Sequence, residues 1–427
     1  MTQAFPESEP VDRPQDDAAV EQLSLWRNRD YMLLWSGQVI STLGTSASTL
    51  VYPLLILAMT NSPAAAGLGS AFGSVPYIVF SLPVGALMDR WDRKRVMILC
   101  DIGRGLTLAS IPIAMLFHML TIWQVYAAAL IEGSLFVFFN IAEVAALPRV
   151  VHKQQLPAAA AQNEAAYGVA AIAGPSIGTF LYQAVSQGAP FIADAVSYIA
   201  SVVSLSFIRI PFQQDRPLGR LDLRREIVEG LHWLWGQPLI RYMAALVSGL
   251  TFVDGAQTLI LIVLAKQVGT QDAQIGLIFS IAGLGGIAGS LVGGHIQKRL
   301  TFGQVIIGMT WAQALLFPLY ALTPRFFLLA TITALFFFTT TIFNIVQFSY
   351  RLALIPDELQ GRVNSTFRLI AWSTRPLGAA LSGLLLERLG ARPTVGVFAL
   401  WGGALALVTL LNRHVRNAPP LERAHEA

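Results

Sequence analysis

The chain has little charge and almost no cysteine. Of its 427 residues, 13% are charged and 54% are hydrophobic. Soluble domains carry about 25% charged residues, and a soluble domain of this length has no way to hide so much apolar surface. A single cysteine, Cys100, excludes an intrachain disulfide and leaves the redox compartment open. The excess apolar surface must therefore face lipid.

Other features that would indicate a secreted protein or an enzyme are also missing. Residues 1–25 are polar and acidic and lack the apolar segment of a signal peptide, so the first apolar span is expected to remain as a membrane helix. The six histidines have no metal-ligand spacing, and no nucleophile has a paired base. We expect no enzyme, no metal and no cofactor. The net charge of +4 does not indicate nucleic acid, because the basic residues lie between apolar spans.

Twelve apolar segments are long enough to cross a bilayer, which takes about 20 residues. They comprise residues 31–59, 64–88, 96–117, 121–147, 158–183, 189–210, 239–265, 273–295, 303–323, 326–350, 363–387 and 393–412. The breaks between them contain Pro, Gly or charge, as at Asn61-Ser62-Pro63. This pattern predicts an all-α polytopic membrane protein.

The distribution of basic residues predicts the orientation. With both termini in the cytoplasm, 24 Lys and Arg residues fall on the cytoplasmic side and four on the outer side, namely Lys266, Arg325, Arg388 and Arg392. Arg375 lies within a span. Because Lys and Arg resist translocation, this asymmetry predicts a multi-pass protein of the cell (inner) membrane with cytoplasmic termini.

The sequence repeats itself at an offset of about 200 residues. Phe139-Asn140-Ile141 recurs as Phe343-Asn344-Ile345, displaced by 204 residues, and Asn163 and Pro175 recur as Asn364 and Pro376, displaced by 201. The repeat predicts two homologous six-helix halves with a site between them. The expected parts are a disordered cytoplasmic tail (1–28), a first bundle (29–210), a linker (211–237), a second bundle (238–413) and a short tail (414–427). An amphipathic surface helix is expected within the linker at 221–234, with a flexible linker as the alternative.

A basic cluster with an acid at its head follows the second span. The residues that define it are Gly85, Asp89, Arg90, Arg93 and Lys94. This spacing resembles the loop between helices 2 and 3 of the major facilitator superfamily. Asp92 stands where the broader family has Gly, as is frequent in the drug:proton antiporter branch that includes macrolide and enterobactin exporters. The alternative is an ordinary positive-inside loop with a chance acid.

The resemblance implies a gating role for Asp89. In facilitator transporters the corresponding acid closes the cytoplasmic side against the eleventh helix, which is expected to begin near Gly361. The second half keeps Lys298 and Arg299 but has Gly293 at the position of Asp89. An aspartate at a helix end can bind the positive end of a neighbouring helix, so only the first copy is expected to act as a latch.

The fifth span contains Gly174, Pro175 and Gly178, which resemble the antiporter signature of drug exporters. Thr179 replaces the second glycine of that signature. Small residues allow helices to approach closely, and proline kinks a helix. Ordinary helix packing is the alternative to an antiporter role.

Acids inside the bilayer are costly and indicate function by default. Glu132 in span four and Asp254 in span seven are the first candidates for binding a proton or a cationic substrate, and Asp194 in span six is the next. Glu143 is expected to pair with Arg149 instead. Arg375 is the one deep basic residue and a candidate partner for an acid or an anionic substrate. Arg104 belongs to the 24 basic residues on the cytoplasmic side and is expected to pair locally with Asp101, three residues away. The related branch has an acid where this chain has Thr45, and no Arg occurs from 105 to 148.

The resemblance implies a central cavity lined by spans one, four, seven and ten. The candidate lining residues are Gln38, Phe136, Phe139, Asn140, Phe343, Asn344 and Arg375. An aromatic cavity with few polar groups suits a bulky amphipathic compound, although phenylalanines that face lipid give the same pattern.

These observations predict a monomeric secondary transporter that exports a hydrophobic drug-like compound or a siderophore in exchange for protons. Its partners are expected to be the substrate, protons and the lipid bilayer. Two alternatives stay open: a lysophospholipid transporter with a lateral opening, and a membrane sensor built on a transporter fold. Flux assays in proteoliposomes distinguish them.

Overall fold

The structure is a computed structural model that describes residues 25–88, 90–213, 223–323, 325–356 and 359–418, without the side chains of residues 86, 153 and 223–227. These residues form helices and no strand. Twelve helical segments among them are long and apolar enough to cross a membrane. The predicted all-α fold with twelve spans is therefore confirmed.

The first six spans are α1 (Arg29–Thr60), α2 (Pro63–Met88), α3 (Arg93–Leu116), α4 (Ile122–Val150), α5 (Leu156–Ala184) and α6 (Ala189–Phe207). The other six are α8 (Pro238–Gln267), α9 (Asp272–Arg299), α10 (Phe302–Leu316) with η3 (Phe317–Leu322), α11 (Phe326–Leu354), α12 (Gln360–Trp372) with α13 (Arg375–Leu389), and α14 (Ala391–Leu411). Shorter helices are η1 (Leu25–Arg27), η2 (Lys153–Gln155), α7 (Leu223–Gly236) and α15 (Arg413–Arg416).

Local chemistry sets where the first span begins and ends. The side chain of Asn28 accepts a hydrogen bond from the backbone N–H of Tyr31 at 3.1 Å, which satisfies one of the donors that a first helical turn leaves free. At the other end, Asn61 adopts a left-handed conformation with φ of 52°. Pro63 then opens α2, at a position where its missing N–H costs nothing.

Two spans are interrupted near prolines. α10 passes into the 3-10 helix η3, which contains Pro318. The eleventh span breaks at Ser373 and Thr374, between α12 and α13, and Pro376 follows as the second residue of α13. Proline has no N–H to continue the helical hydrogen bonds. Broken membrane helices commonly border binding sites, and this break lies beside the cavity described below.

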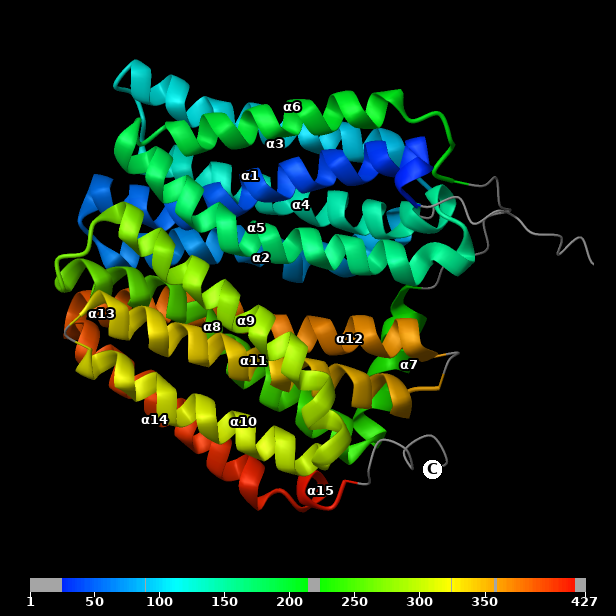
Figure 1. Cartoon of the computed structure of the whole chain (residues 1–427), viewed down its shortest axis with the longest axis vertical. Coiled ribbons are helices and arrows are strands. Elements are labelled where there is room, and N and C mark those ends of the chain that lie inside the picture. The colour runs from blue at the N-terminus through cyan, green and yellow to red at the C-terminus, as the bar shows by residue number, and fades with distance from the viewer. Residues whose placement is uncertain (1–24, 89, 214–222, 324, 357–358, 419–427) are drawn as a thin grey trace, which may run out of the picture.

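The twelve spans form two bundles with the same internal arrangement (Figure 1). In the first bundle, α1 packs against α5 and α6, α2 against α4, and α3 against α4 and α6. In the second bundle, α8 packs against α12, α13 and α14, α9 against α11, and α10 against α11 and α14. These pairings correspond one to one when α1–α6 are matched to α8–α14. The repeat read in the sequence is thus a structural repeat.

The two ends of the molecule are distinguishable. The start of α1, α7 and α15 all lie toward one end (Figure 1), which we call the tail side, and the opposite end is the far side. α7 lies within the predicted linker, of which residues 214–222 are outside the described part. It packs against α8 and α12, and its Leu234 is fully buried. Val228, Leu231 and Trp235 form an exposed apolar stripe on the same helix, as an amphipathic surface helix requires.

The two bundles touch on the far side, where α5 packs against α9 and α2 against α13. The Ser176 hydroxyl lies 2.6 Å from that of Ser280, and the Gln183 amide donates to Gln271 at 3.1 Å. Ser62, which precedes α2, donates to the carboxylate of Glu387. These residues occupy the far-side halves of their spans, so they join the bundles at that end.

Small residues let α5 approach α1 closely. A Cβ atom added at Gly178 would lie 2.0 Å from the carbonyl oxygen of Ala47, and one at Gly174 would lie 2.4 Å from the Cβ of Ser46. Both glycines belong to the antiporter-like motif read in the sequence. Thr179, the residue that departs from that motif, is fully buried and faces α9, with its hydroxyl 3.5 Å from the Ala273 carbonyl oxygen.

We predict that Gly178→Ala destabilises the protein by about 1–3 kcal/mol, because the added methyl overlaps the backbone of α1. The measurement is the midpoint of thermal denaturation in detergent. Gly168→Ala is the matched control, since it lies on the same helix and its added Cβ meets no atom within 4 Å. Equal midpoints for the two variants would contradict the tight contact.

Candidate functional site

A buried arginine on α3 is the centre of a polar cluster inside the first bundle. Arg104 is 2% exposed. Its guanidinium lies 2.7 Å from the Glu132 carboxylate on α4 and 3.7 Å from the carboxylate of Asp101, one turn away on its own helix. It also stacks on the rings of Tyr198 and Phe136, at 4.2 and 5.4 Å from their centroids. The expected local pair with Asp101 exists, but the closer partner is Glu132.

Thr45 connects this arginine to α1 and α6. Its hydroxyl accepts a hydrogen bond from the Arg104 guanidinium at 3.2 Å and lies 2.8 Å from the Tyr198 hydroxyl. The Tyr198 hydroxyl in turn donates to Glu132 at 3.5 Å. Thr45 stands where the related branch has an acid. In this chain, the neutral hydroxyl of Thr45 connects the Arg104 guanidinium with the Tyr198 hydroxyl.

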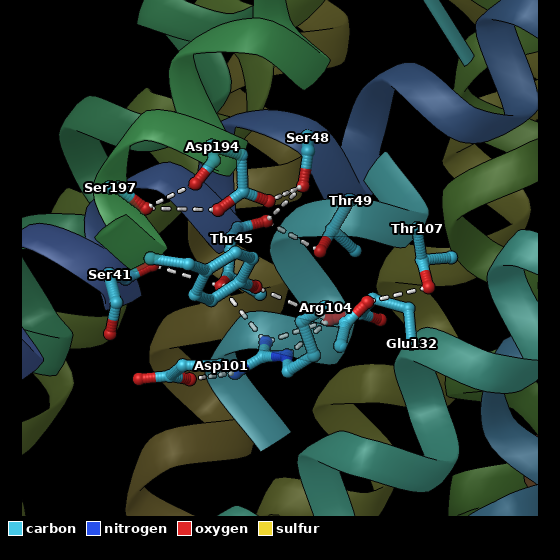
Figure 2. Close-up of polar contacts among 12 residues, drawn as sticks. Ser41, Thr45, Ser48, Thr49, Asp101, Arg104, Thr107, Glu132, Asp194 and Ser197 are labelled. Atoms are coloured by element: carbon cyan, nitrogen blue, oxygen red, sulfur yellow. Dashed lines mark hydrogen bonds and ion pairs between the residues drawn. The ribbon is translucent and has the colours of Figure 1, made fainter. Parts of the chain in front are cut away.

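Asp194 on α6 completes the cluster (Figure 2). Its side chain is fully buried and accepts hydrogen bonds from the hydroxyls of Ser48 at 2.5 Å and Ser197 at 3.2 Å. Gly44 leaves the room for it, because a Cβ there would lie 2.7 Å from an Asp194 oxygen. We call the set Thr45, Ser48, Asp101, Arg104, Glu132, Asp194, Ser197 and Tyr198 the Arg104 cluster.

The charges of the Arg104 cluster do not balance when all its groups are ionised. It holds one guanidinium and the three carboxyl groups of Asp101, Glu132 and Asp194. Moving an ion out of water costs several kcal/mol even after relaxation, and one cation compensates only one carboxylate. Protonation of a carboxyl group removes the excess negative charge.

A cavity of about 320 Å³ lies between the two bundles and reaches this cluster. α1, α2 and α4 line it from the first bundle, and α8, α12 and α13 from the second. Glu132 and Thr45 are part of the wall, and the Glu132 side chain is 18% exposed. The volume falls in the range of small-molecule sites. Glu132 thus gives the buried cluster a point of access to the cavity.

The opposite wall carries the second deep arginine. Arg375, at the start of α13, lies 3.6 Å from the Asp254 carboxylate on α8, and the two side chains are 38% and 46% exposed. Its guanidinium lies over the ring of Trp372, 5.5 Å from the centroid. Lys266 pairs with Asp272 at 2.9 Å instead of with Asp254. Glu132 and Asp254 each face an arginine from another helix, so neither is a free site for a cationic substrate.

The predicted lining residues coincide only partly with this cavity. Phe136 and Arg375 are in its wall, whereas Gln38 lines a separate small cavity with Glu143. Phe139 and Phe343 pack in the apolar cores of their own bundles. Of the two predicted asparagines, Asn140 is half-buried and Asn344 is exposed, and neither contacts the cavity.

The cavity also has different spans from those expected. Spans one, four and seven contribute to it, but span ten (α11) supplies none of the described lining residues, and spans two and eleven take part instead. Glu143 is 6% exposed, and no ion pair joins it to Arg149, although both residues are described. The expectation that Glu143 pairs with Arg149 is therefore wrong.

The basic residues of the gating motif bind helix ends within the first bundle. Arg93 donates to the carbonyl oxygen of Ala145 at 2.7 Å, and Lys94 to that of Ile208 at 2.7 Å. Cations are favourable at such carboxyl ends of helices. Arg90 lies in an exposed turn, and Gly85 lies within α2 with open space beside it. Asp89 is outside the described residues, and its role as a latch stays a prediction.

Two site features were missed in the sequence. Arg104 was counted with the cytoplasmic loop charges, yet it lies buried in α3 beside Glu132. The spacing of Asp101 and Arg104 was the available signal, since two charges on one face of an apolar span need buried partners. Asp92 was read only as a departure from the family pattern, but its side chain caps α3 by accepting from the N–H of Arg95 at 3.1 Å.

Comparisons with known proteins agree with this geometry. The family model of the Major Facilitator Superfamily matches residues 34–373. The chain is 25% identical over 409 residues to the enterobactin exporter EntS of Escherichia coli K12, covering 93% of this chain and 96% of that protein. It is 24% identical over 382 residues to macrolide efflux protein A of Streptococcus pyogenes, covering 87% and 92%.

Solved structures show the same fold at low sequence identity. A bacterial homologue of the iron transporter ferroportin in its inward-facing state aligns with a TM-score of 0.73 and 14% identity, over 91% of this chain and 99% of that one. The nucleoside transporter NupG aligns with a TM-score of 0.71 and 16% identity, over 89% and 98%.

We predict that Arg104→Gln lowers the thermal denaturation midpoint strongly, because removing one partner of a buried ion pair costs about 3–5 kcal/mol. The double variant Arg104→Gln/Glu132→Gln should recover part of the loss, since it no longer buries the Glu132 charge without its cation. Arg392→Gln, an exposed arginine on α14, is the control. A midpoint for Arg104→Gln equal to that of the control would rule out the ion cluster.

Proposed function

The chain belongs to the Major Facilitator Superfamily, and from this premise we propose that it exports a hydrophobic or amphipathic small molecule in exchange for protons by alternating access. The observation that carries the proposal is the contact between the Arg104 cluster and the cavity through Glu132. Export by the relatives named above, of enterobactin and of macrolides, supports the direction and the size class of the substrate.

The proposed orientation places the tail side in the cytoplasm of a cell membrane. The charge asymmetry of the sequence supports it, because 23 Lys and Arg residues are assigned to that side and four to the other, with Arg104 left out since it is buried in α3. The far-side contacts between the bundles support a state that opens toward the tail side. In this orientation, the cavity loads substrate from the cytoplasm, as an exporter requires.

Coupling follows from the partners of Arg104. When Glu132 takes up a proton, its ion pair with Arg104 is lost. Asp101 and Asp194 are then the carboxylates that stabilise the charge of the guanidinium. Glu132 is on α4, whereas the other carboxylates are on α3 and α6. Protonation thus changes which helices are held together, and a ligand shifts a two-state protein only through such differences between states. Substrate in the cavity reaches the same carboxylate, so proton and substrate are linked.

The orientation predicts which loops a membrane-impermeant thiol reagent reaches. In a Cys100→Ala background, Thr270→Cys and Arg325→Cys should react in intact cells, whereas Lys153→Cys and Gln213→Cys should react only after permeabilisation. The measurement is labelling with a charged maleimide. Labelling of the second pair in intact cells would overturn the orientation.

The coupling site predicts a separation between uphill transport and exchange. Glu132→Gln should be produced at normal levels, because Asp101 still compensates Arg104. It should lose the response of flux to an imposed pH gradient and retain downhill exchange, because the glutamine amide cannot take up the proton. The measurement is flux of enterobactin and erythromycin in proteoliposomes with and without the gradient. Asp254→Asn is the matched comparison, because Asp254 pairs with Arg375 as Glu132 pairs with Arg104, and we expect it to keep the response.

Each outcome of this experiment assigns the proton site. A full response in Glu132→Gln with none in Asp254→Asn moves the site to Asp254. A full response in both variants moves it to Asp194, which Asp194→Asn then tests. A full response in all three would remove proton coupling at these acids from the proposal.

A further inference from the structure

A run of alternating cations and aromatic rings crosses from one bundle to the other. Arg368 and Trp372 are four residues apart on α12 and so share one face of that helix, and Arg375 follows the break as the first residue of α13. Tyr77 of α2 lies against them from the first bundle. The guanidinium of Arg368 lies 5.7 Å from the centroid of the Tyr77 ring, the Tyr77 and Trp372 rings are 5.5 Å apart, and Arg375 lies 5.5 Å from the Trp372 ring. We call these four residues the arginine–aromatic ladder.

Three of the four ladder residues line the cavity. Tyr77, Trp372 and Arg375 are part of the cavity wall, Trp372 is 40% exposed, and Arg368 is exposed. Cation–π contacts hold a guanidinium in place while leaving its N–H groups at the edge available. Arg368 donates one of them to the Tyr77 hydroxyl, and a guanidinium has five.

The ladder carries positive charge that carboxylates compensate only in part. Among the described residues, no carboxylate pairs with Arg368, and Asp254 lies 3.6 Å from Arg375 in a half-exposed arrangement. Behind Arg368, Arg351 is 5% exposed, has no described acidic partner and stacks on Phe367 at 3.9 Å from the ring centroid. An anion bound at the ladder would supply the negative charge that these arginines lack.

From this arrangement we infer that the substrate is an aromatic anion, bound with its acidic group on Arg368 and Arg375 and its ring packed against the cavity-facing surfaces of Tyr77 and Trp372. Arginine forks match carboxylate geometry, and charge-assisted hydrogen bonds are about twice as strong as neutral ones. The inference rests on the proposed transport function and specifies its substrate class. Because Tyr77 is on one bundle and the arginines are on the other, the same ligand contacts both halves.

Three naphthalene derivatives of nearly equal size test the inference: 1-naphthoate, 1-naphthylmethanol and 1-naphthylmethylammonium. Binding to the purified full-length protein is measured by isothermal titration calorimetry. We expect naphthoate to bind roughly tenfold more tightly than the alcohol, and the ammonium compound more weakly than both. Arg368→Gln and Arg375→Gln should each lose most of this tenfold preference, whereas Arg392→Gln should keep it.

The alcohol reports whether each variant is folded, since its affinity depends on the rings and not on the arginines. Arg368→Lys and Arg375→Lys keep the charge and should retain part of the preference for naphthoate. Equal affinities for the three compounds, or an unchanged preference in both glutamine variants, would overturn the inference. Arginine-dependent binding of naphthoate by a protein that shows no proton-driven flux would instead sustain the inference and refute the coupling proposed above.

Discussion

Burial of the Arg104 guanidinium is the constraint on which the first bundle depends. A cation inside a membrane-spanning bundle needs partners from several directions, and here they come from four helices: Thr45 on α1, Asp101 on α3 itself, Glu132 on α4 and Tyr198 on α6. Each partner has to be at hydrogen-bonding or stacking distance, so their helices are fixed relative to one another. Two of these partners, Thr45 and Glu132, also line the cavity.

The architecture could be predicted from the sequence because each membrane-spanning helix needs about 20 predominantly apolar residues in a row. Apolar length predicts a span, and the offset of about 200 residues between Phe139 and Phe343 predicted the repeat that the helix pairings then showed. Small residues such as Gly178 signalled close packing, which the structure places between α5 and α1. Each of these features can be recognised within one segment of the sequence, or by comparing two segments that share a short motif.

The site was only partly predictable, because its contacts join segments that are distant in sequence. Glu132 has no basic residue within a turn of its own helix, but Arg104 reaches it from α3 at 2.7 Å. Phe343 was expected in the cavity because the family resemblance implies that span ten lines it, yet it packs inside the second bundle, as Phe139 packs inside the first. These two repeat positions are equivalent, but the cavity wall is not symmetric: α4 supplies described lining residues and α11 supplies none.

The interruption of the eleventh span has a mechanical consequence. α12 is attached to α7 by the Arg362–Glu229 ion pair at 2.6 Å, whereas α13 is wedged against α2, with so little room at Gly383 that a Cβ there would lie 2.5 Å from the Pro63 carbonyl oxygen. The two helices of this span are thus held by different neighbours, and the break between them separates Trp372 on α12 from Arg375 on α13. The span can therefore bend between α12 and α13 instead of tilting as one rigid helix. A displacement of α12 then changes the distance between Trp372 and Arg375 while α13 keeps its contact with α2.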